Sequence, residues 1–212
     1  MILGVNDLDA ATRRCEALGF GVVDGGRHPG LGTANRIVPF GGPQYLELLG
    51  VVDAVEARQN DFGRALLAGI RDGDRLVRWC LGATAAELDA VAARLGLTVE
   101  PRRRTRPDGV TLTWRAAGLA LALAEGWLPF FVAWDRPEQH PGLSPARHAR
   151  APRAFARLTL ATGDRARLDR WLAGANVDVG VIDGPARLHD VTIVTDHGDV
   201  VIGDSSDILG ST

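Results

Sequence analysis

The sequence contains no lysine, and its 24 basic side chains are therefore all arginine. This bias is typical of GC-rich bacterial coding sequences and assigns no function to the guanidinium groups by itself. Acidic residues number 26, so the formal net charge is -2. Without a global excess of positive charge, we expect neither nucleic acid nor an anionic membrane as a partner.

Cysteine is also scarce: Cys15 and Cys80 are the only two, and neither belongs to a CxxC pair. Since both lie in apolar segments, we predict two reduced thiols rather than a disulfide framework. The first residues have no basic region, and no apolar run is long enough to span a membrane. We therefore expect a cytoplasmic protein without a signal peptide.

Several catalytic signatures are missing. The sequence has no glycine-rich phosphate loop before a helix, no GxSxG and no HExxH. It therefore gives no support for phosphoryl transfer, hydride transfer or serine hydrolysis. The hydrophobic fraction of 46%, with 24% charged residues, is nevertheless ordinary for a globular protein with a sizeable core.

The most informative feature that is present is a repeated order of elements. Three glycines that end predicted helices, Gly19, Gly96 and Gly174, are separated by 77 and 78 residues. An apolar run precedes each helix and several follow it, which indicates an α+β fold of repeated βαβββ modules. We place the modules at about 1–50 and 75–135, within a domain 1–150, and a third, shorter βαβββ-like module at 151–212.

One such module cannot close its own sheet, whereas two placed side by side curl into an open, barrel-like cup whose concave face buries a ligand. We pair the first two modules in this way. For the third we expect one of three arrangements: it extends the sheet, covers the mouth of the cup, or pairs with its counterpart in a homodimer.

Three segments carry a resemblance to a known family: HPGLGTANRIVPFGGPQYLELLGVVD from His28, RTRPDGVTLTW from Arg104 and LPFFVAWDRPEQHPG from Leu128. In this order they resemble the glyoxalase-like domain family of the vicinal oxygen chelate superfamily. The resemblance implies βαβββ modules and a small-molecule cavity. It does not choose a reaction, because the superfamily holds isomerases, dioxygenases, epimerases, resistance enzymes and non-catalytic drug binders.

Glu47 is the one carboxylate in the apolar run that follows the Gly-Gly-Pro turn. In a strand it shares a face with Tyr45 and Leu49, so it points either to solvent or into the cup. A superfamily metal site would take a side chain from the first strand and a Glu from the last strand of each paired module. Glu47 has the last-strand position, but the matching first-strand position lies at or before Met1, where no His is present.

The second module offers no metal ligand at the corresponding positions, which are Val77, Arg78, Trp79 and Phe131 to Trp134. We therefore predict no complete metal site and no cofactor. The alternative is a divalent metal ion with Glu47 as its single protein ligand.

His28 and His140 each precede Pro-Gly, in corresponding loops. Convergence of both loops on the mouth of the cup would explain this repetition. We expect at least one of the two His side chains to face the cup, where it can act as base, acid or neutral hydrogen-bond donor; the alternative is that Pro-Gly makes a turn that a His happens to precede. Near His28, we expect Thr33 and Asn35 to orient substrate oxygens.

The remaining candidates lie in the second module. Trp114 and Trp134 would line the cup or belong to the core between helix and sheet. The run Arg102 to Arg106 is best explained as a solvated hairpin, with Arg106, nearest the turn, able to reach a substrate carboxylate.

Two functions follow. The first is a lyase or isomerase acting on a small organic molecule, with Glu47 as base and His28 or His140 handling protons. The alternative is a non-catalytic module that sequesters a metabolite or drug, as bleomycin-resistance proteins do. A purely structural dimerisation unit would leave the polar loops unexplained.

Overall fold

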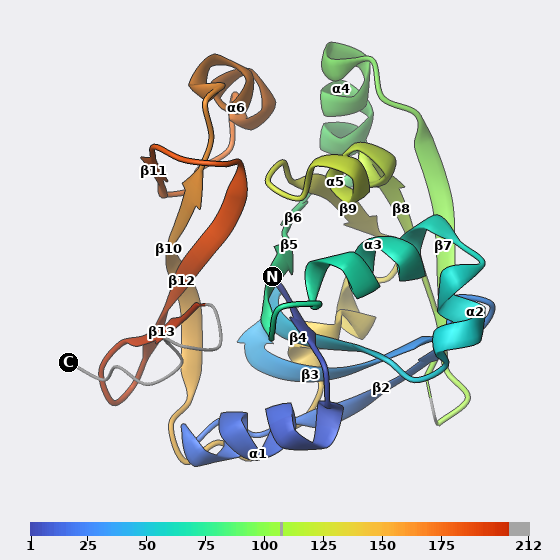
Figure 1. Ribbon diagram of the computed structural model, residues 1–212, viewed down its shortest axis with the longest axis vertical. Coiled ribbons are helices and arrows are strands. Elements are labelled where there is room, and N and C mark those ends of the chain that lie inside the picture. The colour runs from blue at the N-terminus through green and yellow to red at the C-terminus, as the bar shows by residue number, and fades with distance from the viewer. Residues whose placement is uncertain (107, 204–212) are drawn as a thin grey trace.

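The computed structural model describes residues 1–106 and 108–203. Their strands form three sheets, which we call A, B and C (Figure 1). Sheet A has the strand order β2-β3-β4-β1-β5, sheet B β6-β9-β8-β7 and sheet C β11-β10-β12-β13. Among the described residues, no helix is both long and apolar enough to cross a membrane.

The first module consists of β1 (Ile2–Val5), α1 (Leu8–Ala17), β2 (Val23–His28), β3 (Thr33–Gly42) and β4 (Gln44–Val51). The Asp7 side chain caps α1 by accepting hydrogen bonds from two backbone N–H groups of the first turn. Strand β1 runs parallel to β4, and β4 is antiparallel to β3.

Strand β2 begins at Val23, and the apolar residues just before it, Phe20 to Val22, are not part of it. The chain before it is held by a different partner, since the Gly21 N–H donates to His148 Nδ1 at 3.0 Å. The carbonyl of Gly19 likewise accepts from the N–H groups of Ala149 and Arg150. These backbone groups are therefore used by a distant loop and not by a sheet.

Two helices follow β4: α2 (Ala54–Arg58) and α3 (Asp61–Gly69). Leu66 of α3 and Ile70 just after it pack against Ile2 and Leu49 of sheet A. Figure 1 shows α3 between the strands of sheet A and those of sheet B. This helix therefore covers one end of the face that sheet A turns toward sheet B, here called the inner face.

The second module consists of β5 (Arg75–Arg78), β6 (Cys80–Gly82), α4 (Ala85–Leu95), β7 (Val99–Thr105), β8 (Thr111–Ala117), α5 (Leu119–Glu125) and β9 (Phe130–Trp134). Thr84 and Glu87 form a capping box at the start of α4, and Gly96 ends α4 in the left-handed conformation, with φ 66°. In the turn that follows Arg106, Pro107 lies outside the described residues.

Residues 75–82 connect sheets A and B. Their first half, β5, pairs with β1 of sheet A, and their second half, β6, pairs in parallel with β9 of sheet B. The predicted fold class, α+β with two βαβββ modules facing each other around an open cup, is confirmed; sheets A and B do not close into a barrel.

The third module starts after two short 3-10 helices, η1 (Pro137–Gln139) and η2 (Pro141–Leu143). It contains β10 (Pro152–Ala161), α6 (Arg165–Leu172), β11 (Val179–Ile182), β12 (Arg187–Thr195) and β13 (Val200–Ile202). Its first strand, β10, runs parallel to β11, the strand directly after the helix, and antiparallel to β12. In the other two modules the first strand runs parallel to the last, so the third repeats the order of elements but not the order of strands.

The third module packs behind the other two. Leu158 and Ile193 of sheet C share one core with Leu48 of sheet A and Phe131 of sheet B, whose side chains point away from the inner face. Sheet C therefore neither extends the paired sheets nor covers the cup; it supports both from the side opposite to the inner face.

Candidate functional site

The inner face of β4 carries Tyr45, Glu47 and Leu49 in alternation, as the sequence predicts. Leu49 is fully buried under α3, and Tyr45 lies beside the ring of His140, with ring centroids 5.4 Å apart. Glu47 lies between them and is half-buried. The carboxylate therefore points into the cup, between an apolar end covered by α3 and an aromatic end near the β3–β4 hairpin.

A chain of hydrogen bonds fixes the Glu47 carboxylate. The Nδ2 group of Asn35 donates to Glu47 Oε1 at 2.7 Å, and Asn35 Oδ1 accepts from Arg104 Nη1 at 2.8 Å. The same Arg104 nitrogen also donates to the carbonyl of Gly25. Because Arg104 is on β7 and Gly25 on β2, this guanidinium connects the outer edges of sheets A and B and holds the Asn35 amide in one orientation.

Arg78 is the second guanidinium on the inner face. Strand register places Glu47 and Arg78 on either side of Ile2, each on a neighbouring strand. Only 2% of Arg78 is exposed, and its Nη1 has no hydrogen-bond partner among the described residues. Its guanidinium lies 4.9 Å from the ring centroid of Phe62 on α3. Burial lowers the Arg78 pKa to about 10, although the Glu47 charge opposes this.

His28 lies toward the end that α3 covers. Its Nδ1 is 2.9 Å from Thr33 Oγ1, and its ring meets Phe62 edge-on with centroids 6.4 Å apart. Burial lowers the pKa of His28, with the Glu47 charge opposing the effect. The imidazole is therefore neutral near pH 7 and forms a hydrogen-bonded pair with the buried Thr33 hydroxyl.

His140 lies at the opposite end, within an aromatic group formed with Tyr45, Trp134 and Trp114. The His140 and Trp134 centroids are 5.4 Å apart, and those of Trp134 and Trp114 are 5.0 Å apart. His140 Nδ1 accepts from the Gly142 N–H at 3.0 Å, and burial lowers the His140 pKa to about 4. The neutral ring therefore carries its proton on Nε2, which makes that nitrogen a hydrogen-bond donor.

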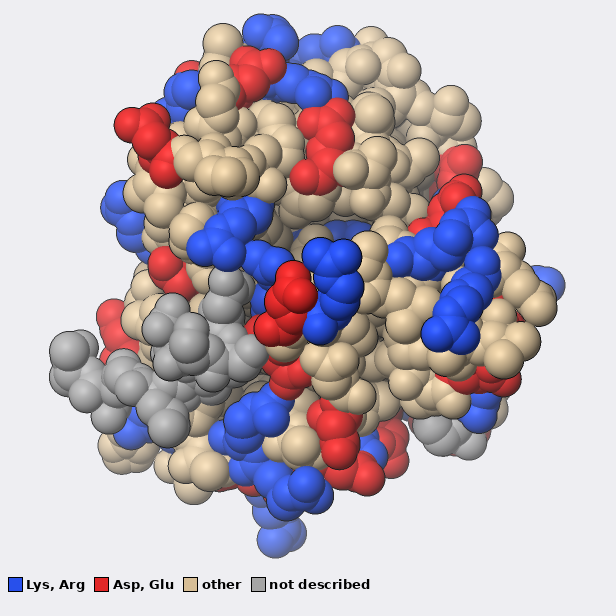
Figure 2. Space-filling model, in the orientation of Figure 1, with Lys and Arg blue, Asp and Glu red and all other residues tan. Residues whose placement is uncertain are grey.

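The structure brings together Glu47, Asn35, Thr33 and His28 on sheet A, and it places His140, Trp114 and Trp134 at the other end of the cup. The two histidine loops thus do not converge. Arg106 pairs with Asp108 beside the turn, and Arg102 pairs with Glu100. Figure 2 shows arginine and acidic side chains interspersed on the face in view. The guanidinium that reaches the cup from this strand is that of Arg104.

Sequence reasoning did not assign a role to Arg78 or Arg104. Arg78 leaves a signal in the sequence, because it interrupts an apolar strand. Arg104 leaves none, because its burial at 8% exposure, beside solvated neighbours in the same run, is seen only in the structure. A charged residue at a position that alternation assigns to the inside is the pattern that identifies such side chains.

The donor set around Glu47 does not fit a divalent metal ion. Its neighbour on β1 is Ile2, and the parallel strand pair of the second module presents Cys80 and Phe130. In the described ranges, no group of three or more His, Cys, Asp or Glu side chains could hold a metal. The two guanidinium groups beside Glu47 further disfavour a cation.

Burial raises the Cys80 pKa, so this thiol is protonated near pH 7.

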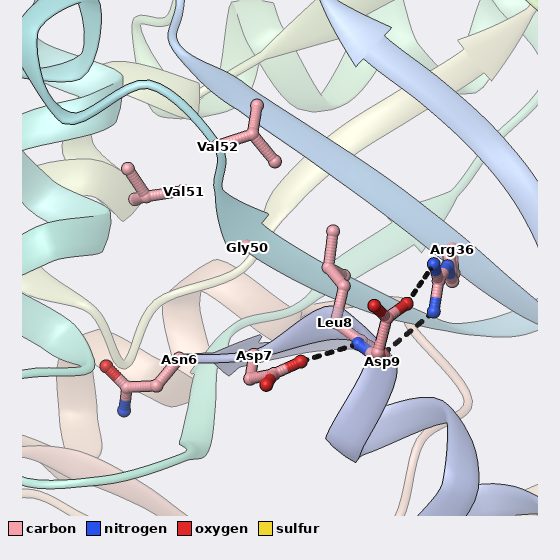
Figure 3. Close-up of a pocket in the computed structure, with 8 residues that line it drawn as sticks. All are labelled: Asn6, Asp7, Leu8, Asp9, Arg36, Gly50, Val51 and Val52. Carbon is pink, nitrogen blue, oxygen red and sulfur yellow. Dashed lines mark hydrogen bonds and ion pairs between the residues drawn. The ribbon is translucent and has the colours of Figure 1, made fainter.

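A separate pocket of about 340 Å³ lies on the α1 side of sheet A (Figure 3). Its charged groups already have partners, since Arg36 pairs with Asp9 and the Asp7 carboxylate caps α1. The pocket therefore offers no free chemistry comparable to that of the inner face.

Paired βαβββ modules around an inward carboxylate define a fold of the vicinal oxygen chelate type. Residues 1–175 match the model of the family described as Glyoxalase-like domain, and the chain belongs to this family. The resemblance noted in the sequence is thereby confirmed. No curated protein matches the chain.

One solved structure shows the same fold, and two others are more distant likenesses. A hypothetical protein from Staphylococcus aureus is 13% identical and aligns with a TM-score of 0.67 over 90% of this chain and 87% of that one. Methylmalonyl-CoA epimerase from Streptomyces coelicolor is 20% identical, with a TM-score of 0.45 over 64% and 94% of the two chains. The Mn(II)-bound glyoxalase from Novosphingobium aromaticivorans is 15% identical, with a TM-score of 0.46 over 90% and 62%.

Proposed function

We propose that this protein binds a small organic molecule between its two inner faces and acts as an isomerase or lyase, with Glu47 as the base. The observation that carries this proposal is the position of one carboxylate at the centre of the cup, held by Asn35 at 2.7 Å. Only Oε1 is used in this bond. Within the described part of the chain Oε2 has no hydrogen-bond donor, so it is the oxygen that takes a proton from a ligand.

The step that suits this arrangement is proton removal from a carbon next to a carbonyl group. Glu47 takes the proton, the C–H electron pair forms a carbon–carbon double bond, and the carbonyl electrons move to its oxygen. Delivery of a proton to the opposite face of the same carbon gives an epimer, and delivery to a neighbouring position gives an isomer. No oxidant or reductant is needed.

The other polar side chains have supporting roles in this proposal. His140 Nε2–H is a neutral donor that suits a carbonyl oxygen gaining negative charge. The hydroxyl of Thr33 and the ring of His28 form a second polar contact near the α3 end. Asn35 uses both ends of its amide on Glu47 and Arg104, so it positions the base rather than the substrate.

Binding without turnover is the second candidate function. The aromatic group of Tyr45, Trp114, Trp134 and His140 favours it, because flat apolar rings on a half-buried surface suit an organic ligand regardless of chemistry.

Hydrogen exchange distinguishes these functions. The protein is incubated in D₂O with 2-oxo and 3-oxo compounds, and loss of their C–H signals is followed by proton NMR. Catalysed exchange that disappears in Glu47→Gln supports the enzyme. Ligand binding that quenches tryptophan fluorescence equally in both proteins, without exchange, supports the binding module. Exchange that persists in Glu47→Gln rules out Glu47 as the base.

A further inference from the structure

The Arg78 guanidinium differs from the other buried charges of the inner face. Arg104, at 8% exposure, donates to a carbonyl and to the Asn35 amide. Arg78, at 2% exposure, keeps its Nη1 without an acceptor among the described residues. A buried guanidinium nitrogen without an acceptor loses its water and gains nothing in return. Such a group is explained when a ligand supplies the missing acceptor.

Building on the proposed function, we propose that Arg78 binds the carboxylate group of the substrate and thereby directs the neighbouring carbon toward Glu47. The substrate class is a small carboxylic acid whose acidic C–H lies beside a carbonyl group.

Charge supports an anion at this position. The cluster contains two guanidinium groups, Arg78 and Arg104, and one carboxylate, Glu47, while burial lowers the pKa of His28 and keeps its ring neutral. One further negative charge would balance the net positive charge of this cluster, whereas a phosphate dianion would be repelled by Glu47. A planar carboxylate also matches the flat edge of a guanidinium.

Distance supports the same assignment. Glu47 and Arg78 flank Ile2 on neighbouring strands, so their Cα atoms lie about 10 Å apart. Both side chains extend to the inner face. A carboxylate on Arg78 therefore leaves room for two or three substrate atoms before the Glu47 oxygen. The guanidinium carbon of Arg78 also lies 4.9 Å from the centroid of the Phe62 ring, which helps to fix its position.

Acetoacetate and acetoacetamide are matched probes, because both carry acidic C2 protons and only the first has a carboxylate. Their dissociation constants are measured by tryptophan fluorescence at constant ionic strength, alongside inorganic phosphate. We expect acetoacetate to bind about 10- to 100-fold more tightly than acetoacetamide, as for loss of one charged hydrogen bond. Arg78→Met should remove this preference and Arg78→Lys should restore part of it. Replacement of the exposed Arg103 by Met should leave it unchanged.

Equal affinity for the two probes, no binding of either, or a preference retained in Arg78→Met would overturn the assignment, and tighter binding of phosphate would overturn the choice of a carboxylate. The exchange assay separates this result from the proposed function. Exchange of both probes at one rate, lost in Glu47→Gln, leaves the base in place and removes only the role of Arg78. A carboxylate preference without exchange retains the anion site and removes the enzyme.

Discussion

Replacing Arg78 by Met should make the ligand-free protein more stable, although Arg78 is among its most buried residues. Met keeps much of the apolar length of the arginine side chain and removes the charge. The reason to expect a gain is that this charge has no hydrogen-bond acceptor at Nη1.

The size of the effect follows from the pKa. Burial lowers the Arg78 pKa from 12.5 to about 10. At 1.36 kcal/mol for each tenfold change in the acid constant, keeping Arg78 charged inside the fold costs about 3 kcal/mol. The contact with the Phe62 ring offsets about 1 kcal/mol of this cost. We therefore expect Arg78→Met to raise the free energy of unfolding by about 1 to 2 kcal/mol.

Arg104→Met is the matched control, because it removes a buried guanidinium that does have partners. It would leave the Gly25 carbonyl and Asn35 Oδ1 without their donor. The expected effect has the opposite sign, a loss of about 2 to 4 kcal/mol.

Both variants are measured by urea unfolding at pH 7, followed by tryptophan fluorescence and circular dichroism. The stabilities of a variant and the unmodified protein can be compared when the slope of the free energy of unfolding against urea concentration is the same for both. A loss of stability in Arg78→Met as large as that in Arg104→Met would refute the reasoning, since it would mean that the Arg78 charge is satisfied within the free protein.

Three further predictions test the surroundings of the site. Gly25→Ala should destabilise the protein by about 1 to 3 kcal/mol and slow the exchange of ligand C–H hydrogen in D₂O, because its Cβ would lie against Asn35 Oδ1. Gly42→Ala is the control: with open space around Gly42, it should not change stability in the same urea assay. Burial lowers the His140 pKa from 6.5 to about 4, so the unfolded chain takes up a proton at a higher pH than the folded protein does. The free energy of unfolding should therefore fall as the pH drops from 6.5 toward 4. Urea unfolding curves at a series of pH values should show a smaller fall in His140→Asn. Trp171→Ala, which removes a buried ring and its 2.7 Å bond to the Pro129 carbonyl, should cost about 3 to 5 kcal/mol in thermal or urea unfolding; a loss below about 1 kcal/mol would show that α6 contributes little.

Local signals predicted much of the fold. Thr84 and Glu87 mark the start of α4 and Gly96 its end, because capping depends on neighbouring residues alone. The third module shows the limit of such signals. Its helix and strands follow the predicted order, but the pairing of β10 with β11 is a contact between distant residues that no local pattern specifies.

The site, like the fold, was predictable where local alternation decides and not where contacts between distant residues decide. Alternation along β4 identifies Glu47 as a residue that shares its face with Tyr45, and the structure shows that this face is the inner one. Which arginine of the 102–106 run faces inward depends on the register between β7 and β8, which the sequence does not reveal. The interrupted apolar strand marks Arg78 in the sequence, but its contact with Phe62, a helical residue, exists only in three dimensions.

The shared segment 75–82 ties sheets A and B together. Trp79, between β5 and β6, is 4% exposed and donates from Nε1 to the Trp127 carbonyl at 2.8 Å. Because this short stretch pairs with β1 on one side and β9 on the other, the two sheets cannot swing apart like a clam shell without breaking strand pairing. For the ligand that we propose, entry would therefore require displacement of parts that lie over the ends of the cup: α3 at one end, and the loop that carries His140 at the other.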